Sequence, residues 1–228
     1  MGTALGASPA TLREALPVFL RHGSPRVLLA ALAAALALRL ALGGWSAWDL
    51  LPPLLIAALW PLQEWAIHVA ILHFRPRRVG RWTLDFQVPR EHRAHHAAPY
   101  EIALVFIPLR SFLYTLPLLA ALCWLAAPSL PLAATSLASY LLLALHYEWI
   151  HFLIHTRVWP RSALYQRLWR NHRLHHFKNE RFWYGVTRLR GDRLLGTDGD
   201  PREVPTSATA RSLLGDGSTN PLRHPRVT

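Results

Sequence analysis

The stretch "LPLAATSLASYLLLALHYEWIHFLIH" (130–155) joins two features that decide the fold, a long apolar run and a pair of histidines at its end. About 20 mainly apolar residues are enough for a helix to cross the hydrocarbon core of a bilayer. Three further apolar segments of similar length lie at residues 27–44, 50–73 and 102–127. The sequence therefore predicts an all-α integral membrane protein with four transmembrane helices.

The distribution of Lys and Arg predicts that these helices form two hairpins. The connections "GGWSAWD" (43–49) and "APSLP" (127–131) are short and contain no Lys or Arg. The basic clusters fall on the N-terminal segment, on the connection between Arg75 and Arg93, and on the chain after Arg157. Positive connections stay on the cytoplasmic side. We therefore expect these three segments, which include a helical cap, on the cytoplasmic face.

Two arginines interrupt the apolar segments. Arg39 lies in the first segment and Arg110 in the third. A charged side chain is costly within the bilayer. We therefore expect the first span to end early and the third to start near Ser111.

The chain before the first span predicts a short interfacial helix in "SPATLREALPVFLRHG" (8–23). Ser8 is the expected N-cap and Pro9 the first helical residue, with Leu12, Leu16 and Phe19 on one face. We divide the chain into an N-terminal cytoplasmic segment (1–26), a membrane domain (27–197) and a polar tail (198–228). The Gly, Pro, Ser, Thr and Arg content of the tail predicts disorder.

Composition excludes several classes of protein. The net charge of +12 could suit a nucleic-acid-binding protein. However, the basic residues alternate with apolar runs in a chain that is 52% hydrophobic and only 17% charged. This composition favours a membrane protein over a nucleic-acid-binding protein. Cys123 is the only cysteine, so disulfides and cysteine-held iron–sulfur clusters are excluded. Lys178 is the only lysine among 25 basic residues, which favours a GC-rich bacterial genome and hence a bacterial inner membrane over the endoplasmic reticulum.

Histidines carry the chemistry. Of 13 in the chain, ten form four groups: His68 and His73; His92, His95 and His96; His151 and His155; His172, His175 and His176. Spacings of three and four residues place side chains on one face of a helix, which lets several imidazoles converge. His68 and His73 are five residues apart, roughly 140° around an ideal helix, and can share a site only if the helix ends or distorts between them.

Ten imidazoles exceed the four to six ligands of one ion and predict a centre of two metal ions. Neutral imidazole suits Zn, Cu, Fe or Ni, so ligand type leaves the metal open. Carboxylates near the groups are predicted to support the ligands: Glu64, Glu91 and Glu148, with Asp85 also beside the first cluster.

The order H-x4-H, H-x-x-H-H, H-x3-H, H-x-x-H-H, with a membrane hairpin between the second and third groups, resembles the fatty acid hydroxylase and sterol desaturase superfamily. The H-x4-H spacing is closer to the fatty acid 2-hydroxylase branch. The segment "YGVTRLRGDRLLGT" (184–197) is similar to the closing segment of that family, with Asp192 as a further supporting residue. Gly191 stands where the family often has an aromatic residue.

The resemblance implies a non-haem di-iron, O₂-dependent lipid hydroxylase with all ten grouped histidines as ligands of two Fe ions, and zinc as an alternative occupant in purified protein. The expected substrate is a fatty acyl chain, possibly attacked at C2. A sterol or carotenoid hydroxylase or desaturase of the same superfamily stays open. Since no cytochrome b5-like domain precedes residue 27, electrons are expected from a separate ferredoxin or cytochrome b5-like donor. Five aromatic residues near the last cluster either shape the entrance for the acyl chain or form an interfacial belt, and the belt is expected for most of them: Trp169, Phe177, Phe182, Trp183 and Tyr184.

Two rival classes fit less well. A membrane zinc hydrolase needs a general base beside a three-ligand zinc, but "HFLIH" (151–155) lacks the glutamate of H-E-x-x-H. A metal transporter should hold its ligands near the bilayer midplane, whereas these histidines gather at one end of the spans.

Overall fold

The computed structural model describes residues 8–214 and is mainly helical. Its elements in chain order are α1 (Leu12–Arg21), α2 (Gly23–Leu42), η2 (Ala47–Leu50), α3 (Leu51–Ile67), η3 (His68–Leu72), β1 (Arg77–Val79), β2 (Trp82–Leu84), α4 (Gln87–Ala97), η4 (Ile102–Leu104), η5 (Leu109–Ser111), α5 (Phe112–Ala126), α6 (Leu130–Ile154), α7 (Ala163–Phe177) and α8 (Arg190–Leu194).

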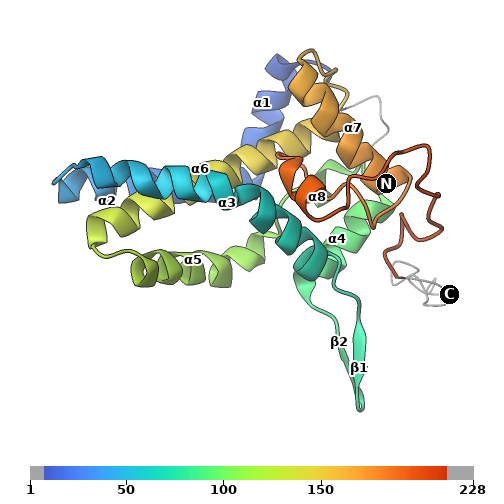
Figure 1. The fold of residues 1–228 in the computed structure, drawn as a ribbon, viewed down its shortest axis with the longest axis horizontal. Coiled ribbons are helices and arrows are strands. Elements are labelled where there is room, and N and C mark those ends of the chain that lie inside the picture. The colour runs from blue at the N-terminus through green and yellow to red at the C-terminus, as the bar shows by residue number, and fades with distance from the viewer. Residues whose placement is uncertain (1–7, 215–228) are drawn as a thin grey trace.

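Four helical segments are long and apolar enough to cross a membrane: Gly23–Leu42, Ala47–Leu72, Ile102–Ala126 and Leu130–Ile154. They confirm the four predicted spans. In Figure 1, α2, α3, α5 and α6 run alongside one another, while α4, α7 and α8 gather at one end and α1 lies across that end. Leu54, Leu113 and Leu125 are 67%, 80% and 76% exposed, as expected for side chains that face lipid.

Helix α6 is the centre of the bundle and packs against α2, α3 and α5. Leu28 and Ala35 of α2, Phe112 of α5, and Ala138 and Leu141 of α6 form one buried cluster. Alanine at these contacts lets the helices approach closely, which is how helices associate in a solvent as apolar as their own side chains.

The regular α-helix of the third segment starts near the predicted Ser111, although the apolar segment that is long enough to cross a membrane begins at Ile102. Regular α-helix begins only at Phe112, after two short 3₁₀ turns at η4 and η5. The first span differs from the prediction, because α2 continues past Arg39 to Leu42.

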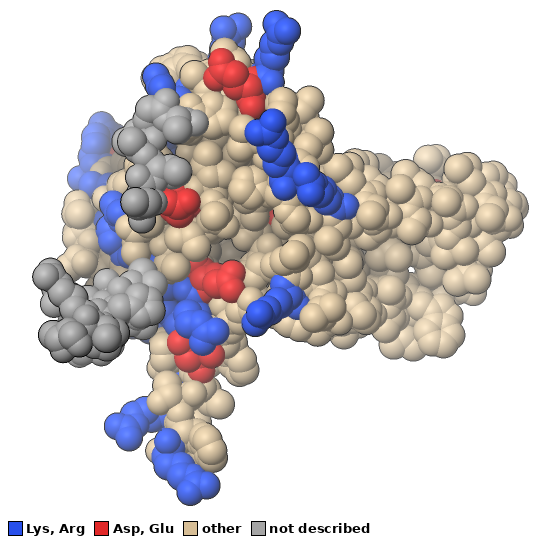
Figure 2. Space-filling view, turned by 180° about the vertical axis from the view of Figure 1, so that it is seen from behind, with Lys and Arg blue, Asp and Glu red and all other residues tan. Residues whose placement is uncertain are grey.

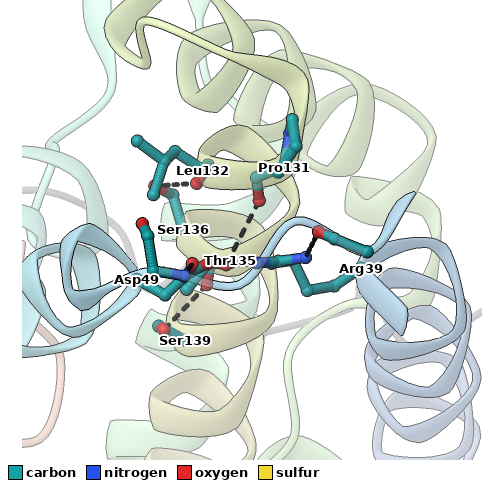
Figure 3. A network of polar contacts seen from close by, with 9 residues as sticks. Arg39, Asp49, Pro131, Leu132, Thr135, Ser136 and Ser139 are labelled. Carbon is teal, nitrogen blue, oxygen red and sulfur yellow. Dashed lines mark hydrogen bonds and ion pairs between the residues drawn. The ribbon is translucent and has the colours of Figure 1, made fainter. Parts of the chain in front are cut away.

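Arg39 stays in the helix because it is neutralised inside the protein. Its side chain is 2% exposed and forms an ion pair with Asp49, at 2.7 Å between Nη2 and Oδ1. Nε donates to Thr135 of α6 and Nη1 to the Gly43 carbonyl, at 2.9 and 2.6 Å. The guanidinium also lies 3.6 Å from the ring centroid of Trp45. Figure 3 shows how this network joins α2, the η2 turn and α6 at the end of the bundle far from the histidines.

The N-terminal helix also differs in detail. Thr11, rather than Ser8, caps α1 by accepting a hydrogen bond from the Glu14 N–H at 3.2 Å. Phe19 is buried against the rings of Trp149 and Phe152 of α6, whereas Leu12 and Leu16 are 58% and 49% exposed. The predicted apolar face is therefore divided between a packed side and an open side.

Breaking the Arg39–Asp49 pair should destabilise the bundle. Asp49→Asn keeps the size of the side chain but leaves the buried guanidinium without its counter-charge, so we expect the midpoint of thermal unfolding in detergent to fall by at least roughly 5 °C. The matched control is Asp200→Asn, which removes the exposed Asp200–Arg202 pair and should leave the midpoint unchanged. Equal effects of the two substitutions would contradict a stabilising role for the buried pair.

Candidate metal centre

The ten grouped histidines converge in space as two groups of five. Group 1 contains His68, His73, His92, His96 and His175, and group 2 contains His95, His151, His155, His172 and His176. In each group one nitrogen per residue can be chosen so that all five lie within 4.8 Å of one another. The rings of His96 and His176 stack at 4.0 Å between centroids, so the two groups adjoin.

Each H-x-x-H-H cluster contributes to both groups, but the α4 cluster contributes mainly to group 1 and the α7 cluster mainly to group 2. The first and last histidines of the α4 cluster, His92 and His96, belong to group 1, and His95 crosses to group 2. In α7 the first and last histidines belong to group 2, and His175 crosses to group 1. Each helix thus gives two nitrogens to one group and one to the other. The repeated motif thus contributes to both groups from both helices.

A π-helical turn brings His68 and His73, which are five residues apart, to the same side of the helix. Residues His68–Leu72 form a π-helix, and the His73 N–H donates to the His68 carbonyl at 3.0 Å, five residues back. A π turn takes in one residue more than an α turn, which brings positions i and i+5 to the same face. The distortion required by the sequence is therefore present between the two histidines.

Backbone carbonyls orient four of the ten rings. The Nδ1 atoms of His68, His96, His151 and His175 lie 2.7, 2.8, 3.0 and 2.8 Å from the carbonyl oxygens of Tyr184, Ala210, Val105 and Phe182. A carbonyl oxygen can only accept, so Nδ1 carries the proton in the neutral ring and Nε2 keeps its lone pair. These carbonyls belong to loops and could not be recognised from side-chain patterns.

The remaining nitrogens fit a metal ion. The Nε2 atoms of His68, His92, His96 and His151 are buried without a hydrogen-bond partner among the described residues. Other pairs bring Nε2 atoms close together, such as His155 with His172 at 3.0 Å and His73 with His175 at 3.2 Å. Opposite nitrogen ligands of one ion lie roughly 4.2 Å apart, since each bond is about 2.1 Å. A spread of 4.8 Å needs only a small contraction.

Electrostatics keeps the imidazoles neutral. For the eight grouped histidines outside the spans, burial is the main cause of a lowered pKa, and for His96 it brings the pKa to about 3. Repulsion between neighbouring imidazolium ions lowers the pKa of most of these histidines further, for example that of His92 beside His96. A neutral imidazole is the form that ligates metal. Both groups can therefore offer five neutral nitrogen donors.

Two of the predicted supporting carboxylates, Glu64 and Glu148, do not contact the imidazole rings directly. Glu64 accepts hydrogen bonds from Val186 and Thr187, and Glu148 accepts from Ser24 and Ile107. Both carboxylates thus hold loops and do not hold imidazoles. Glu64 fixes the loop just after Tyr184, and Glu148 fixes the segment just after Val105, the two residues whose carbonyls orient His68 and His151.

Glu91 and Asp85 have other partners. Glu91 accepts a hydrogen bond from Gln87 on its own helix, at 2.7 Å. Asp85 pairs with Arg93. Their expected support of the first histidine cluster is therefore not seen as direct contact with a ring.

Asp192 organises the closing segment. Its carboxylate is fully buried and accepts from the N–H groups of Tyr184 and Gly185, both at 2.8 Å, and from the Thr197 hydroxyl at 2.7 Å. Burial raises the pKa of Asp192, and these hydrogen bonds oppose that change. The carboxylate thereby fixes the backbone whose Tyr184 carbonyl orients His68.

Gly191 permits the close packing of α8 on α3. A Cβ atom at this position would lie 2.3 Å from the Pro61 carbonyl oxygen and 3.1 Å from the Cβ of Trp65. No side chain fits there without moving the backbone. The glycine that departs from the family pattern therefore has a packing reason in this chain.

Residues 198–214 correct the predicted disordered tail. Leu213 is 2% exposed and Ala210 3% exposed. The Ala210 carbonyl contacts His96, and Arg211 donates to the backbone carbonyls of His96 and Ala97. This segment covers group 1 despite its polar composition, because its backbone and small side chains pack on α4. The rest of the predicted tail, residues 215–228, lies outside the described residues.

Two of the five aromatic residues expected in an interfacial belt are buried, and one of them, Tyr184, lies beside the histidines. Trp183 and Tyr184 are 3% and 8% exposed. The Tyr184 ring lies 5.2–5.3 Å from the rings of His68, His73 and His175. Phe177 is 37% exposed, and Trp169 and Phe182 are partly buried.

The fold and the site define a class of protein: a four-span membrane bundle whose cap holds two adjoining all-histidine groups able to bind metal ions. A family model of fatty acid hydroxylases matches residues 53–197, and the chain belongs to this family. The predicted family resemblance is thus confirmed.

Two known proteins are similar to this chain. The dihydroceramide fatty acyl 2-hydroxylase FAH2 of Arabidopsis thaliana is 27% identical over 139 residues, which cover 60% of this chain and 56% of that protein. The chain therefore matches little more than half the length of this curated relative. A solved structure of full-length scs7p, in which only the hydroxylase domain is visible, is similar with a TM-score of 0.61 and 22% identity, over 88% of this chain and 70% of that one. It shows that the fold is shared.

The division into two groups predicts how metal is lost. The pair His73→Ala and His175→Ala removes two nitrogens from group 1 only, and His155→Ala with His172→Ala does the same for group 2. We expect each double variant to retain about one metal ion per chain where the wild type holds about two, since three nitrogens bind far more weakly than five. Inductively coupled plasma mass spectrometry of purified protein measures this ratio.

The control is His146→Ala, which changes a histidine outside both groups and should retain the full metal content. If either double variant lost both ions while remaining monodisperse, the two groups would not be separate sites.

Proposed function

We propose that this protein is an O₂-dependent lipid hydroxylase that holds two iron ions, one in each histidine group. The observation that carries the proposal is the position of two adjoining groups of five neutral imidazoles at the end of four apolar spans. A metal centre placed there is within reach of an acyl chain whose head group remains at the membrane surface.

Iron is proposed because unactivated C–H bonds do not yield to acid–base chemistry. Two bound iron ions would supply the redox chemistry with O₂ that breaks such a bond. The balanced reaction takes one C–H bond, O₂, two electrons and two protons to the alcohol and water. Zinc binds similar donors and is expected to compete for the site in purified protein.

The chain's own residues prepare the site for this reaction. Loop carbonyls fix the orientation of four rings before metal binds, which reduces the reorganisation that binding requires. Nine of the ten histidines are buried, so bulk water is kept from most of the donor set. Tyr184 presents its ring to group 1 and forms part of the apolar wall that a substrate chain would meet.

A fatty acyl chain is the substrate that we propose, with C2 as the position attacked. The support is the family match, the H-x4-H spacing and the curated relative, which is named a dihydroceramide fatty acyl 2-hydroxylase. Sterol or carotenoid hydroxylation or desaturation is the second candidate, because the same histidine pattern serves those reactions in the superfamily.

A zinc hydrolase has less support. Such an enzyme needs a carboxylate or imidazole base free to act beside the metal. Three of the buried carboxylates, Glu64, Glu148 and Asp192, accept backbone hydrogen bonds that hold loops, and a fourth, Glu180, accepts from the Thr209 hydroxyl at 2.6 Å. Five imidazoles in each group also exceed the three protein ligands typical of catalytic zinc.

We propose that the electrons come from a separate acidic carrier, a ferredoxin or a cytochrome b5-like protein, which docks on the outer face of α7. The inner face of α7 carries His172, His175 and His176. The outer face forms a shallow hollow lined by Trp169, Arg170, Arg173, Leu174, Phe177 and Lys178. The Phe177 ring lies 6.2 Å from the His176 ring, so a donor bound there would be close to group 2.

We further propose that the histidine end faces the cytoplasm and that the protein resides in a bacterial inner membrane. The support is the distribution of Lys and Arg, which avoids both connections at the opposite end. The opposite end carries Arg39 only as a buried, paired residue.

Untargeted lipid mass spectrometry tests the reaction. Cells expressing the wild type, with iron, oxygen and a ferredoxin–reductase pair supplied, are expected to gain lipids heavier by one oxygen. The double variant His175→Ala, His176→Ala removes one nitrogen from each group and should abolish that gain, whereas His146→Ala should preserve it. Fragmentation of the product locates the hydroxyl group.

Two outcomes would count against the proposal. Loss of two hydrogens in place of a gained oxygen would establish a desaturase. Full product formation by a correctly folded His175→Ala, His176→Ala variant would show that the histidine centre does not perform the reaction.

A further inference from the structure

A short β-hairpin projects from the bundle between two histidines of group 1. Strands β1 and β2 pair antiparallel, with Arg77 opposite Leu84, Arg78 opposite Thr83 and Val79 opposite Trp82. All six residues are exposed. A two-stranded hairpin alone is only marginally stable in water, so a surface that covers part of this hairpin would stabilise it.

The two faces of the hairpin differ in character. Opposite residues of an antiparallel pair share a face, so Arg77, Val79, Trp82 and Leu84 lie together and Arg78 and Thr83 lie on the other side. Val79, Trp82 and Leu84 are 56%, 65% and 41% exposed. One face is therefore an apolar, tryptophan-bearing surface that no other described part of the chain covers.

The hairpin is also strongly basic. Residues 75–84 contain four arginines and no Asp or Glu, and all four are exposed: Arg75, Arg77, Arg78 and Arg81. Figure 2 shows Lys and Arg side chains at the projecting end of this part of the molecule, while acidic side chains lie nearer its base. The charge therefore suits an anionic surface.

Arg93 ties the base of the hairpin to the metal centre. Its guanidinium donates to the Phe74 carbonyl before β1 at 3.0 Å and pairs with Asp85 after β2 at 2.5 Å. Arg93 is 2% exposed and follows His92 directly on α4. The two ends of the hairpin are thus clamped together on the helix that carries three of the grouped histidines.

The position of the hairpin indicates what covers it. It follows the second span within a few residues, at the histidine end of the bundle. Figure 1 shows that it extends across the direction of α2, α3, α5 and α6, so it runs along the plane of a membrane that these helices cross. Tryptophan and arginine are the residues that favour the boundary between hydrocarbon and phosphate.

We propose that this hairpin is a membrane-surface anchor, which lays Val79, Trp82 and Leu84 on the bilayer and pairs its arginines with anionic phospholipid head groups. Through the Arg93 clamp, contact with lipid restrains the connection between His73 and His92 of group 1. The inference does not depend on the reaction that the metal centre performs.

A fluorescent label on each face of the hairpin tests the proposal. In a Cys123→Ser background, Val79→Cys or Thr83→Cys provides a single thiol for an environment-sensitive dye. Each full-length variant is placed as one copy per nanodisc, in phosphatidylcholine alone or mixed with phosphatidylglycerol. We expect the label at residue 79 to show blue-shifted emission and quenching by nitroxide head-group lipids in the anionic discs, and the label at residue 83 to be quenched less.

A charge variant provides the second measurement. Changing Arg77, Arg78 and Arg81 to Gln should lower the quenching at residue 79 in anionic discs to the level found in neutral discs, while the metal content of the protein stays unchanged. Equal, water-like emission from both labels would overturn the proposal. A blue shift that appears only with two copies per disc would overturn it as well and would assign the apolar face to contact between copies.

Discussion

Ten imidazoles must be buried in one place while each keeps a lone pair directed inward, and this constraint governs the structure. A buried nitrogen without a partner is costly, so a ring that can bind a metal ion through one nitrogen is stabilised by a hydrogen bond at the other. For His68, His96, His151 and His175 the hydrogen bond goes to a loop carbonyl. The loops around the centre are therefore as necessary as the helices.

The buried carboxylates serve this constraint indirectly. Glu64, Glu148 and Asp192 accept hydrogen bonds from the backbone near the carbonyls that orient the rings. A carboxylate held by two or three donors fixes a loop more firmly than a neutral acceptor, because charged hydrogen bonds are the stronger ones. Four of the imidazole rings are thus oriented by neutral carbonyls. The negatively charged carboxylates hold the loops and do not contact the histidine nitrogens.

Polar groups near lipid are stabilised in different ways at the two ends of the bundle. At the histidine end, the imidazoles are neutral because burial lowers their pKa values. At the other end, Arg39 remains charged and is balanced by Asp49. Between these ends the helices contact one another through alanine, leucine and phenylalanine. The middle of the bundle is therefore held by apolar packing, and its two ends are held by specific polar contacts.

The sequence by itself determined the four spans, the two hairpins of helices, the grouping of ten histidines and the need for a distortion between His68 and His73. Hydropathy, helical period and residue spacing are local properties, so they can be read along the chain. The start of the regular helix after Arg110 was predictable for the same reason.

The tertiary structure alone decided which histidine belongs to which group, because that depends on how α4 and α7 face each other across the centre. It also decided that Arg39 is paired within the bundle, that Glu64 and Glu148 hold loops, and that residues 198–214 cover His96. Each of these outcomes rests on a contact between residues far apart in the chain. Such contacts follow from the packing of whole helices, which no local pattern specifies.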